Sequence, residues 1–307
     1  MDLEQKSIER IKMASEMSLH HYGKPLICTY SGGKDSDVML ELFKRSGVPF
    51  EVHNSHTTVD APPTVYHIRN TFRDLELLGI HCDIDYHRQP DGHFITMWNL
   101  IPTKLMPPDR KVRYCCRDLK EGYGKNRMIA TGVRWAEGPK RQLRSQFEIL
   151  GRSAGGNIGA DEEIMLSNDN DIRRQIIERC EMKAKLVVNP ILEWPDRAVW
   201  EYYWSECKRH NLLYKIGYYR VGCLLCPLAG KKWREKEAHD FPTYPRAYIR
   251  AFDKMLEVRK ARGFPTEWKS GEEVYAWWMR DETISGQMNM FDDGFLNPAP
   301  CDECLRK

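Results

Sequence analysis

One short segment constrains the fold of this 307-residue chain more than any other. An apolar run at 25–30 leads straight into the sequence Ser-Gly-Gly-Lys-Asp-Ser at 31–36, and closely spaced apolar residues follow at 38–43. This order predicts a strand, a glycine loop and a helix, and glycine lets the backbone approach an oxyanion closely. The free amides at the start of the helix add donors and positive potential. The segment therefore predicts a loop that binds phosphate.

Strand-like and helix-like patterns continue to alternate after this loop. We expect a helix at about 64–78 and further strands at 50–53, 82–86, 128–133, 147–150 and 163–166. Strands that alternate with helices predict a parallel sheet with helices on both faces. The sequence therefore predicts an α/β fold with a parallel, twisted sheet, followed by a smaller and mostly helical region.

The composition changes near residue 190, after which Trp, Tyr and Lys recur at helical spacing. We therefore expect an α/β domain that carries the loop at 1–190 and a helical region at 191–287. The last stretch, 288–307, has little periodicity and reads as a C-terminal tail.

Composition sets only broad limits on function. The formal net charge of +3 is too small to argue for a nucleic-acid partner by itself. No apolar run approaches the roughly 18 residues of a membrane span, and the opening residues 1–17 are charged throughout, unlike a signal peptide. We expect a cytoplasmic protein without a membrane segment.

Ten cysteines are a notable number for a chain expected in the cytoplasm, where they indicate metal or catalytic thiols more than disulfides. Six of them form three close pairs: Cys115 with Cys116, Cys223 with Cys226, and Cys301 with Cys304. The first two pairs supply four thiolates, which can hold a [4Fe–4S] cluster or a tetrahedral zinc ion. Neighbouring side chains tend to diverge, so the vicinal pair favours iron–sulfur, with zinc as the alternative. The third pair is compatible with a redox dithiol, a sulfur-carrying pair or half of a zinc site.

The loop at 31–36 resembles the PP-loop of the adenine nucleotide alpha-hydrolase-like superfamily, whose members bind ATP or a sulfonucleotide and cut or use the alpha-phosphate bond. A Walker A loop is excluded because its first glycine would stand at Cys28. Downstream motifs narrow the resemblance to the phosphoadenosine phosphosulfate reductase family over about 27–227. The resemblance implies a HUP-like fold and a nucleotide ligand held by the loop residues Ser31, Gly32, Gly33, Lys34, Asp35 and Ser36.

Two further motifs extend this resemblance to the substrate side. The segment 130–141 is similar to the family's Gly-x-Arg-x-x-(Glu or Ser)-x-x-x-Arg motif, with Gly132, Arg134 and Arg141 at the matching positions. The family's arginines contact phosphate or sulfate, which suits a guanidinium fork. The segment 59–64 resembles the family's loop that approaches the adenosine, which implies a nucleotide contact for Asp60. Lys34, Asp35 and the two arginines are the expected catalytic residues, and Mg²⁺ would share the phosphate charge.

The cysteine pattern is similar to that of cluster-bearing adenylyl-sulfate reductases and of the ATP pyrophosphatase component of DNA phosphorothioation. The reductases attack sulfur with a cysteine in a Glu-Cys-Gly-Leu-His-like segment, of which 303–305 is only a partial echo. They also tend to lack the complete loop that this chain keeps. The intact loop therefore favours ATP as the nucleotide, and the cluster cysteines favour sulfur as the group transferred.

Three hypotheses follow from these residues. In the first, an ATP pyrophosphatase adenylates an acceptor, such as a nucleic-acid phosphate or base. Sulfur from a donor such as a cysteine desulfurase then displaces AMP. The basic and aromatic segment 231–234 is compatible with a nucleic-acid acceptor. In the second, a reductase of adenylyl sulfate or its 3′-phosphorylated form uses Cys301 or Cys304 as the nucleophile. In the third, the chain is a regulatory subunit that binds nucleotide and metal without turnover.

Overall fold

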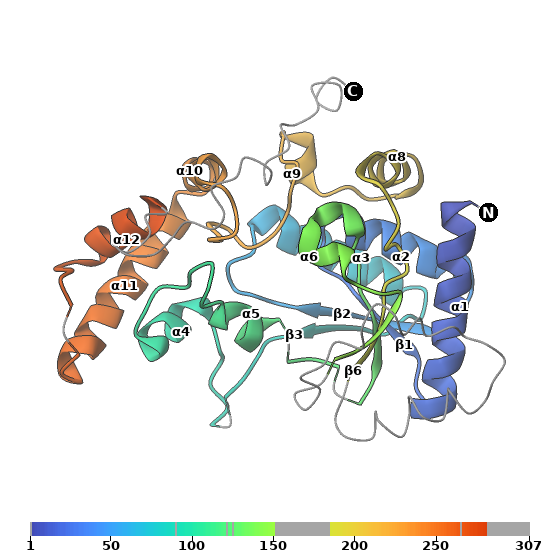
Figure 1. The fold of residues 1–307 in the computed structure, drawn as a ribbon, viewed down its shortest axis with the longest axis horizontal. Coiled ribbons are helices and arrows are strands. Elements are labelled where there is room, and N and C mark those ends of the chain that lie inside the picture. Colours follow the sequence, from blue (N-terminus) through green and yellow to red (C-terminus); the bar gives the residue numbers. More distant parts are fainter. Residues whose placement is uncertain are drawn as a thin grey trace. The chain divides into compact units, whose positions relative to one another are not determined.

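The computed structural model describes residues 2–89, 91–120, 122–124, 126–150, 185–264 and 266–280. The chain divides into two compact units, each built from separate segments (Figure 1). Unit 1 comprises Met1–Asn54, Pro63–Asp85 and Tyr123–Val221, and unit 2 comprises Ser55–Pro62, Tyr86–Gly122 and Gly222–Lys307. This division interleaves along the chain, whereas the ranges expected from the sequence, 1–190, 191–287 and 288–307, follow one another.

Unit 1 contains a six-stranded sheet in the order β3–β2–β1–β4–β6–β5. Strand β1 pairs in parallel with both β2 and β4, and β4 pairs in parallel with β6. The α/β class and the mostly parallel sheet are therefore confirmed. The strands are β1 Leu26–Thr29, β2 Phe50–Ser55, β3 Cys82–Asp85, β4 Met128–Ala130, β5 Phe147–Leu150 and β6 Lys185–Val188.

The edge strand β5 departs from the expected parallel order because it runs antiparallel to β6. Its sequence, Phe-Glu-Ile-Leu, fits a strand of either direction, so composition could not fix its orientation. The further strand expected at 163–166 lies outside the described residues.

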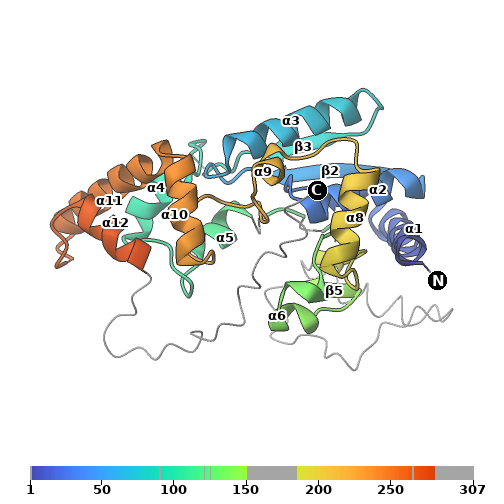
Figure 2. The same cartoon turned by 90° about the horizontal axis from the view of Figure 1, so that it is seen from above.

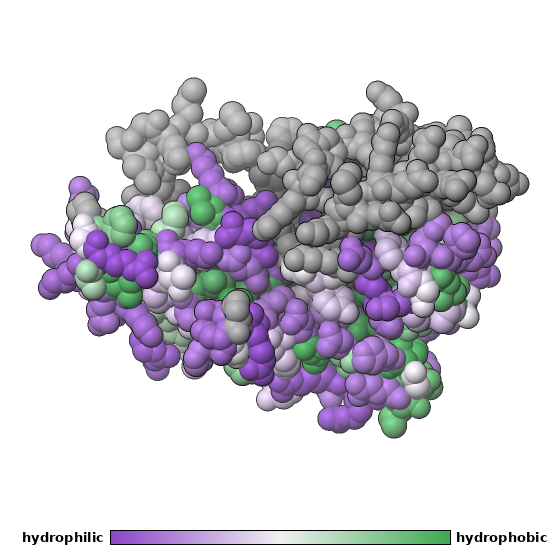
Figure 3. Space-filling model, turned by 90° about the horizontal axis from the view of Figure 1, so that it is seen from below, coloured by the Kyte–Doolittle hydropathy of each residue, from purple (hydrophilic) through white to green (hydrophobic). Residues whose placement is uncertain are grey.

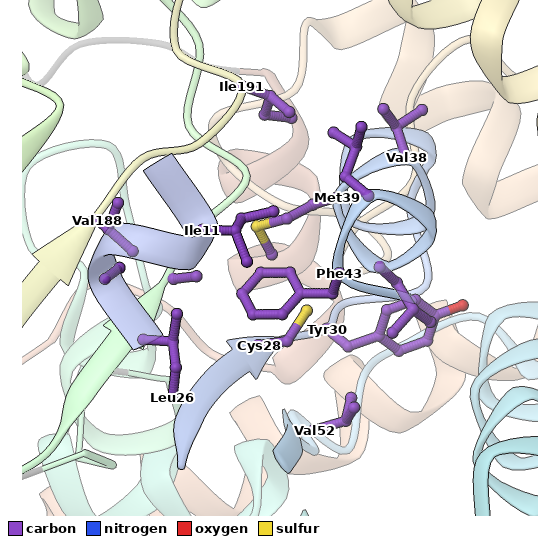
Figure 4. Packing of buried hydrophobic residues seen from close by; sticks show 14 of the residues in the cluster. Ile11, Leu26, Cys28, Tyr30, Val38, Met39, Phe43, Val52, Val188 and Ile191 are labelled. Atoms are coloured by element: carbon purple, nitrogen blue, oxygen red, sulfur yellow. The ribbon is translucent and has the colours of Figure 1, made fainter. Parts of the chain in front are cut away.

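Alternate residues of the central strands face opposite sides of the sheet. Leu26, Cys28 and Val188 join the large cluster formed with helices α1, α2, α3 and α8 (Figure 4). Ile27, Ile129 and Val187 form a smaller cluster on the other side. The helical elements of unit 1 are α1 Leu3–Tyr22, α2 Lys34–Ser46, α3 Pro62–Glu76, α6 Pro139–Gln142, α8 Asp196–Glu206 and α9 Leu212–Lys215, with a 3₁₀ turn at Trp135–Glu137.

Unit 2 is helical in its described part and has its own core, in which α11 packs against both α4 and α12 (Figure 2). Arg234, in the basic segment 231–234, is fully buried, with its guanidinium 4.4 Å from the ring centre of Trp278. The expectation that this segment suits a nucleic acid is therefore wrong for Arg234, because the core holds it. The helices are α4 Met97–Lys104, α5 Tyr114–Leu119, α10 Lys231–Asp240, α11 Thr243–Ala261 and α12 Gly271–Arg280.

The described surface is mostly polar in the view of Figure 3, with scattered apolar residues. Among the described helices, none combines the length and the apolar character that a membrane crossing requires.

Candidate functional site

The glycine loop follows β1 directly and ends at the first turn of α2. Gly32 has a φ of 71°, and a Cβ there would lie 2.8 Å from Cγ1 of Ile68. Both the left-handed backbone and the close contact require glycine at this position. The loop therefore has a fixed path at the carboxyl end of a parallel strand, where ligands bind in open α/β sheets.

Ser36 organises the loop from inside. Its hydroxyl donates to the carbonyl oxygen of Gly33 at 2.7 Å and accepts from the amide of Ser31 at 3.3 Å. Ser36 is buried. Ser36 therefore connects Ser31, which precedes the two glycines, with Gly33, the second of them.

Asp35 joins the two cations of the site. Its carboxylate lies 2.9 Å from Nζ of Lys34 and 2.6 Å from Nε of Arg134. Gly132 passes beside it, since a Cβ there would be 3.5 Å from the backbone of Asp35. The structure thus brings together four of the residues expected at the site.

Arg134 is 1% exposed, and each nitrogen of its guanidinium donates a hydrogen bond to a protein acceptor. It also donates to the carbonyl oxygen of Trp194 at 3.0 Å and to Asp196 at 2.7 Å. Burial opposes the charge of Arg134, but the carboxylates of Asp35 and Asp196 hold its pKa above the ordinary value. Its geometry supports positioning of Asp35 more than direct contact with a phosphate.

Arg141, the second arginine expected at the site, lies on the short helix α6 and its side chain is 44% exposed. Its Nε lies 3.8 Å from the carboxylate of Glu137. No contact in the described part of the chain joins it to Lys34 or Asp35, so its phosphate role stays a prediction.

Two residues of the segment 211–215 hold the loop and were not expected from the sequence. Asn211 donates to the carbonyl oxygen of Gly32 at 2.8 Å, and the hydroxyl of Tyr214 accepts from the amide of Lys34 at 2.8 Å. Nζ of Lys34 also lies 5.3 Å from the ring centre of Trp200. The aromatic residues Trp200 and Tyr214 therefore form one wall of the loop.

A buried network stands behind the loop and joins the residues on either side of it. The hydroxyl of Tyr30 lies 2.9 Å from Nε2 of His67 and also contacts Asp37. Nε2 of His67 lies 3.0 Å from the same carboxylate. Burial, reinforced by the charge of Asp37, raises the pKa of Tyr30 well above its ordinary value, so its hydroxyl keeps its proton. No sequence signal identified this network, because its members meet only in the folded chain.

The four cysteines expected to bind metal all belong to unit 2. Cys115 and Cys116 open helix α5. A hydrogen bond with Cys116, burial and the charges of Cys223 and Cys226 together raise the pKa of Cys115. Cys115 and Cys223 also pack against the same core cluster of unit 2.

The surroundings of Cys223 include a residue expected at the nucleotide. Asp60 forms a backbone bridge with Cys223, and Sγ of Cys223 lies 3.4 Å from Oγ1 of Thr57. The sulfur of Cys223, to which the ammonium of Lys120 hydrogen-bonds, and the carboxylate of Asp60 raise the pKa of Lys120. Asp60 thus lies with the cysteines in unit 2, and its contact with a nucleotide stays a prediction.

The donor set fits a four-sulfur metal group by its chemistry, with a lysine to offset thiolate charge. In the described ranges, no three Cys, His, Asp or Glu side chains already have the spacing of a metal site. Cys301 and Cys304 lie outside the described residues.

A mostly parallel sheet, with a glycine loop at the carboxyl end of its first strand, places the chain in the α/β class. The family model described as "Phosphoadenosine phosphosulfate reductase domain" matches residues 25–229, and the chain belongs to this family. The expected family is therefore confirmed.

Individual relatives are distant. The uncharacterized protein MJ0066 of Methanocaldococcus jannaschii is 23% identical over 229 residues, covering 71% of this chain and 39% of its own length, so the chain spans about two fifths of that relative. A phosphoadenylyl-sulfate reductase structure from Candida auris has a TM-score of 0.42 at 15% identity and covers 71% of this chain and 88% of its own. The U34-tRNA thiolase NcsA from Methanococcus maripaludis was solved with its [4Fe–4S] cluster. It has a TM-score of 0.37 at 13% identity, and the match covers 100% of this chain and 93% of the thiolase chain.

Proposed function

We propose that this protein is a PP-loop ATP pyrophosphatase of the phosphoadenosine phosphosulfate reductase family that adenylates an acceptor for sulfur transfer. The observation that carries the proposal is the complete loop at 31–36, folded on Ser36, with Lys34 held at its mouth by Asp35. A loop that reaches beyond one phosphate suits a triphosphate better than a sulfonucleotide. ATP with Mg²⁺ is therefore the proposed nucleotide.

The proposed reaction starts with attack of an acceptor oxygen on the alpha phosphorus of ATP. A bond forms between these two atoms, the bond from the alpha phosphorus to the bridging oxygen of the beta phosphate breaks, and pyrophosphate leaves. The acceptor's proton passes to solvent. The amides at the start of α2 and the ammonium of Lys34 would stabilise the charge on the departing phosphates, together with Mg²⁺.

Adenylation makes the acceptor oxygen a good leaving group. A sulfur nucleophile then forms a bond to the acceptor atom that carried this oxygen, and AMP departs with the oxygen. In this proposal the acceptor is a nucleic acid, and a partner such as a cysteine desulfurase supplies persulfide sulfur. A thiol reductant provides the two electrons that convert this sulfur to the sulfide level, and the thiol leaves as a disulfide.

The proposed cluster ligands are Cys115, Cys116, Cys223 and Cys226, with zinc as the alternative metal. When bound to these four thiolates, a [4Fe–4S] group would supply electron transfer. Lys120, which contacts Cys223, would offset part of the thiolate charge.

A product assay tests the proposal. Protein purified without air is incubated with Mg·ATP, a sulfur source and single-stranded nucleic acid, and AMP and pyrophosphate are counted. The proposal predicts equimolar AMP and pyrophosphate that require the acceptor. Sulfite release from adenylyl sulfate, with no pyrophosphate from ATP, would instead establish the reductase.

The reductase is the second candidate because the matching family model is named for it. It would use Cys301 or Cys304 as the nucleophile. Tight Mg·ATP binding without AMP or pyrophosphate from any acceptor would favour the regulatory subunit.

A further inference from the structure

A pocket of about 310 Å³ opens on unit 2 close to the cysteines. Three rings line it: those of His56 and Tyr86 have centres 5.1 Å apart, and those of Tyr86 and Phe94 are 6.4 Å apart. Tyr86 is 40% exposed and Phe94 is 47% exposed, so their rings are accessible to a ligand. The volume lies at the small end of ligand pockets, which suits a single ring system.

The pocket is joined to the cysteine site through one short segment. His56 and Thr58 line the pocket, whereas Thr57, between them, is buried and its hydroxyl meets the sulfur of Cys223. Oγ1 of Thr58 accepts from the amide of Met97, which fixes this wall to helix α4. A ring in the pocket would therefore contact the residues on either side of Thr57, which itself contacts Cys223.

Positive charge gathers on the same unit. Residues 86–120 contain seven Lys or Arg against three Asp or Glu. The guanidinium of Arg88 lies 3.8 Å from the ring centre of Phe94, beside the pocket. Four basic residues flank the vicinal cysteines and are exposed: Arg110, Lys111, Arg113 and Arg117.

Hydrogen bonds tie this basic segment to the other two features. Nε2 of His87, in the loop that carries Tyr86, lies 2.7 Å from the carbonyl oxygen of Leu119 at the end of α5. Nε of Arg110 donates to the carbonyl oxygen of Pro227, next to Cys226, at 2.9 Å. The aromatic pocket, the basic segment and the cysteines therefore form one connected surface within unit 2.

We infer that this surface binds single-stranded nucleic acid, with an unpaired base in the pocket of His56, Tyr86 and Phe94 and the neighbouring phosphates on the basic segment around 110–117. Stacking of bases on aromatic rings beside a basic track is how proteins hold unpaired strands. A base inside a duplex cannot enter such a pocket. The inference rests on the proposed function, in which the acceptor is a nucleic acid. It narrows the sulfur acceptor to an unpaired base or its adjoining phosphate.

Binding without turnover tests this inference separately from the reaction. Fluorescence anisotropy of a labelled 12-nucleotide single strand of mixed sequence is measured at several salt concentrations, with a hairpin duplex as competitor. The double variant Tyr86→Ala with Phe94→Ala should bind at least tenfold more weakly without changing the salt slope. Phe94→Leu, which keeps apolar volume but removes the ring, should show part of the same loss.

The charge arm uses a different readout. The double variant Lys111→Gln with Arg113→Gln should make the negative slope of log affinity against log salt shallower by about 1.4. Each phosphate contact on a single strand contributes about 0.7 to the magnitude of this slope. The matched controls are Phe264→Ala, an equally exposed ring of unit 2, and Arg246→Gln with Arg250→Gln on α11. Both controls should bind the strand like the parent protein.

Three results would overturn the inference. The aromatic variants could match the Phe264 control, the hairpin duplex could compete as well as the single strand, or the aromatic variants could weaken Mg·ATP binding equally, which would assign the pocket to the adenine of the nucleotide. If strand binding behaves as predicted but no AMP forms, the proposed reaction fails while the binding surface stands.

Discussion

The phosphate loop of unit 1 and the cysteine site of unit 2 are built in opposite ways. The loop is fixed from within by Ser36 and from the side by Asn211, and each contact is a normal protein hydrogen bond. The cysteines come from two separate segments and lie half-buried, with Thr57 and Lys120 beside Cys223. Protein hydrogen bonds hold the shape of the loop, whereas a metal would complete the geometry of the cysteines.

The strongest test of this contrast removes the cysteines. We expect Cys223→Ser with Cys226→Ser to lower bound iron at least tenfold, because half of the four-sulfur donor set is lost, while the Kd for Mg·ATP changes less than twofold. Iron analysis, the visible absorbance of the cluster and nucleotide titration measure the two effects. Cys207→Ser, which alters a buried cysteine of unit 1, should retain full iron. Equal loss of iron in both variants would contradict the assignment.

The next effect tests how firmly the loop is held. Asp35→Ala leaves the buried guanidinium of Arg134 without one of its carboxylates, and the free energy of unfolding should fall by about 3 kcal/mol. Denaturant titration measures this change. The matched control is Asp74→Ala, which breaks the exposed pair with Arg209 and should cost much less, because solvent screens that pair. Similar losses of unfolding free energy in the two variants would show that the pair of Asp35 with Arg134 stabilises the protein no more than an exposed ion pair does.

The smallest effect isolates one contact in the loop. Gly32→Ala should cost about 2 kcal/mol and weaken Mg·ATP binding, because the new methyl meets Ile68 and the backbone stays left-handed. Gly23→Ala shares the left-handed backbone but meets nothing within 4 Å, so its cost should be about 1 kcal/mol with unchanged nucleotide affinity. Calorimetric unfolding and nucleotide titration compare the two. Equal losses of stability and Mg·ATP affinity in Gly32→Ala and Gly23→Ala would show that the loop can shift to accommodate the methyl group.

The parts predicted from the sequence are those determined by neighbouring residues. The strand before the loop, the loop itself and the start of α2 follow from apolar spacing, two glycines and a lysine within about 20 residues. The joint use of Cys115, Cys116 and the later CxxC as metal ligands stays a prediction, which rests on four thiolates in two close pairs.

The remaining features depend on contacts between distant segments. Asn211 and Tyr214 reach the loop across about 180 residues, and no local pattern separates them from ordinary core residues. Arg134 matched a family motif, but its burial between Asp35 and Asp196 is set by packing. The grouping of Asp60 with the cysteines likewise follows from how the chain interleaves its two units.

The most direct measurement is a binding competition without air on metal-loaded protein, in which Mg·ATP is titrated against adenylyl sulfate and its 3′-phosphorylated form. The parent protein and Lys34→Ala are compared, with Lys44→Ala at the far end of the same helix as the control. We predict a preference for Mg·ATP that is lost in Lys34→Ala and kept in Lys44→Ala. A preference for either sulfonucleotide that survives the loss of Lys34 would contradict the adenylating function and make the reductase the better description.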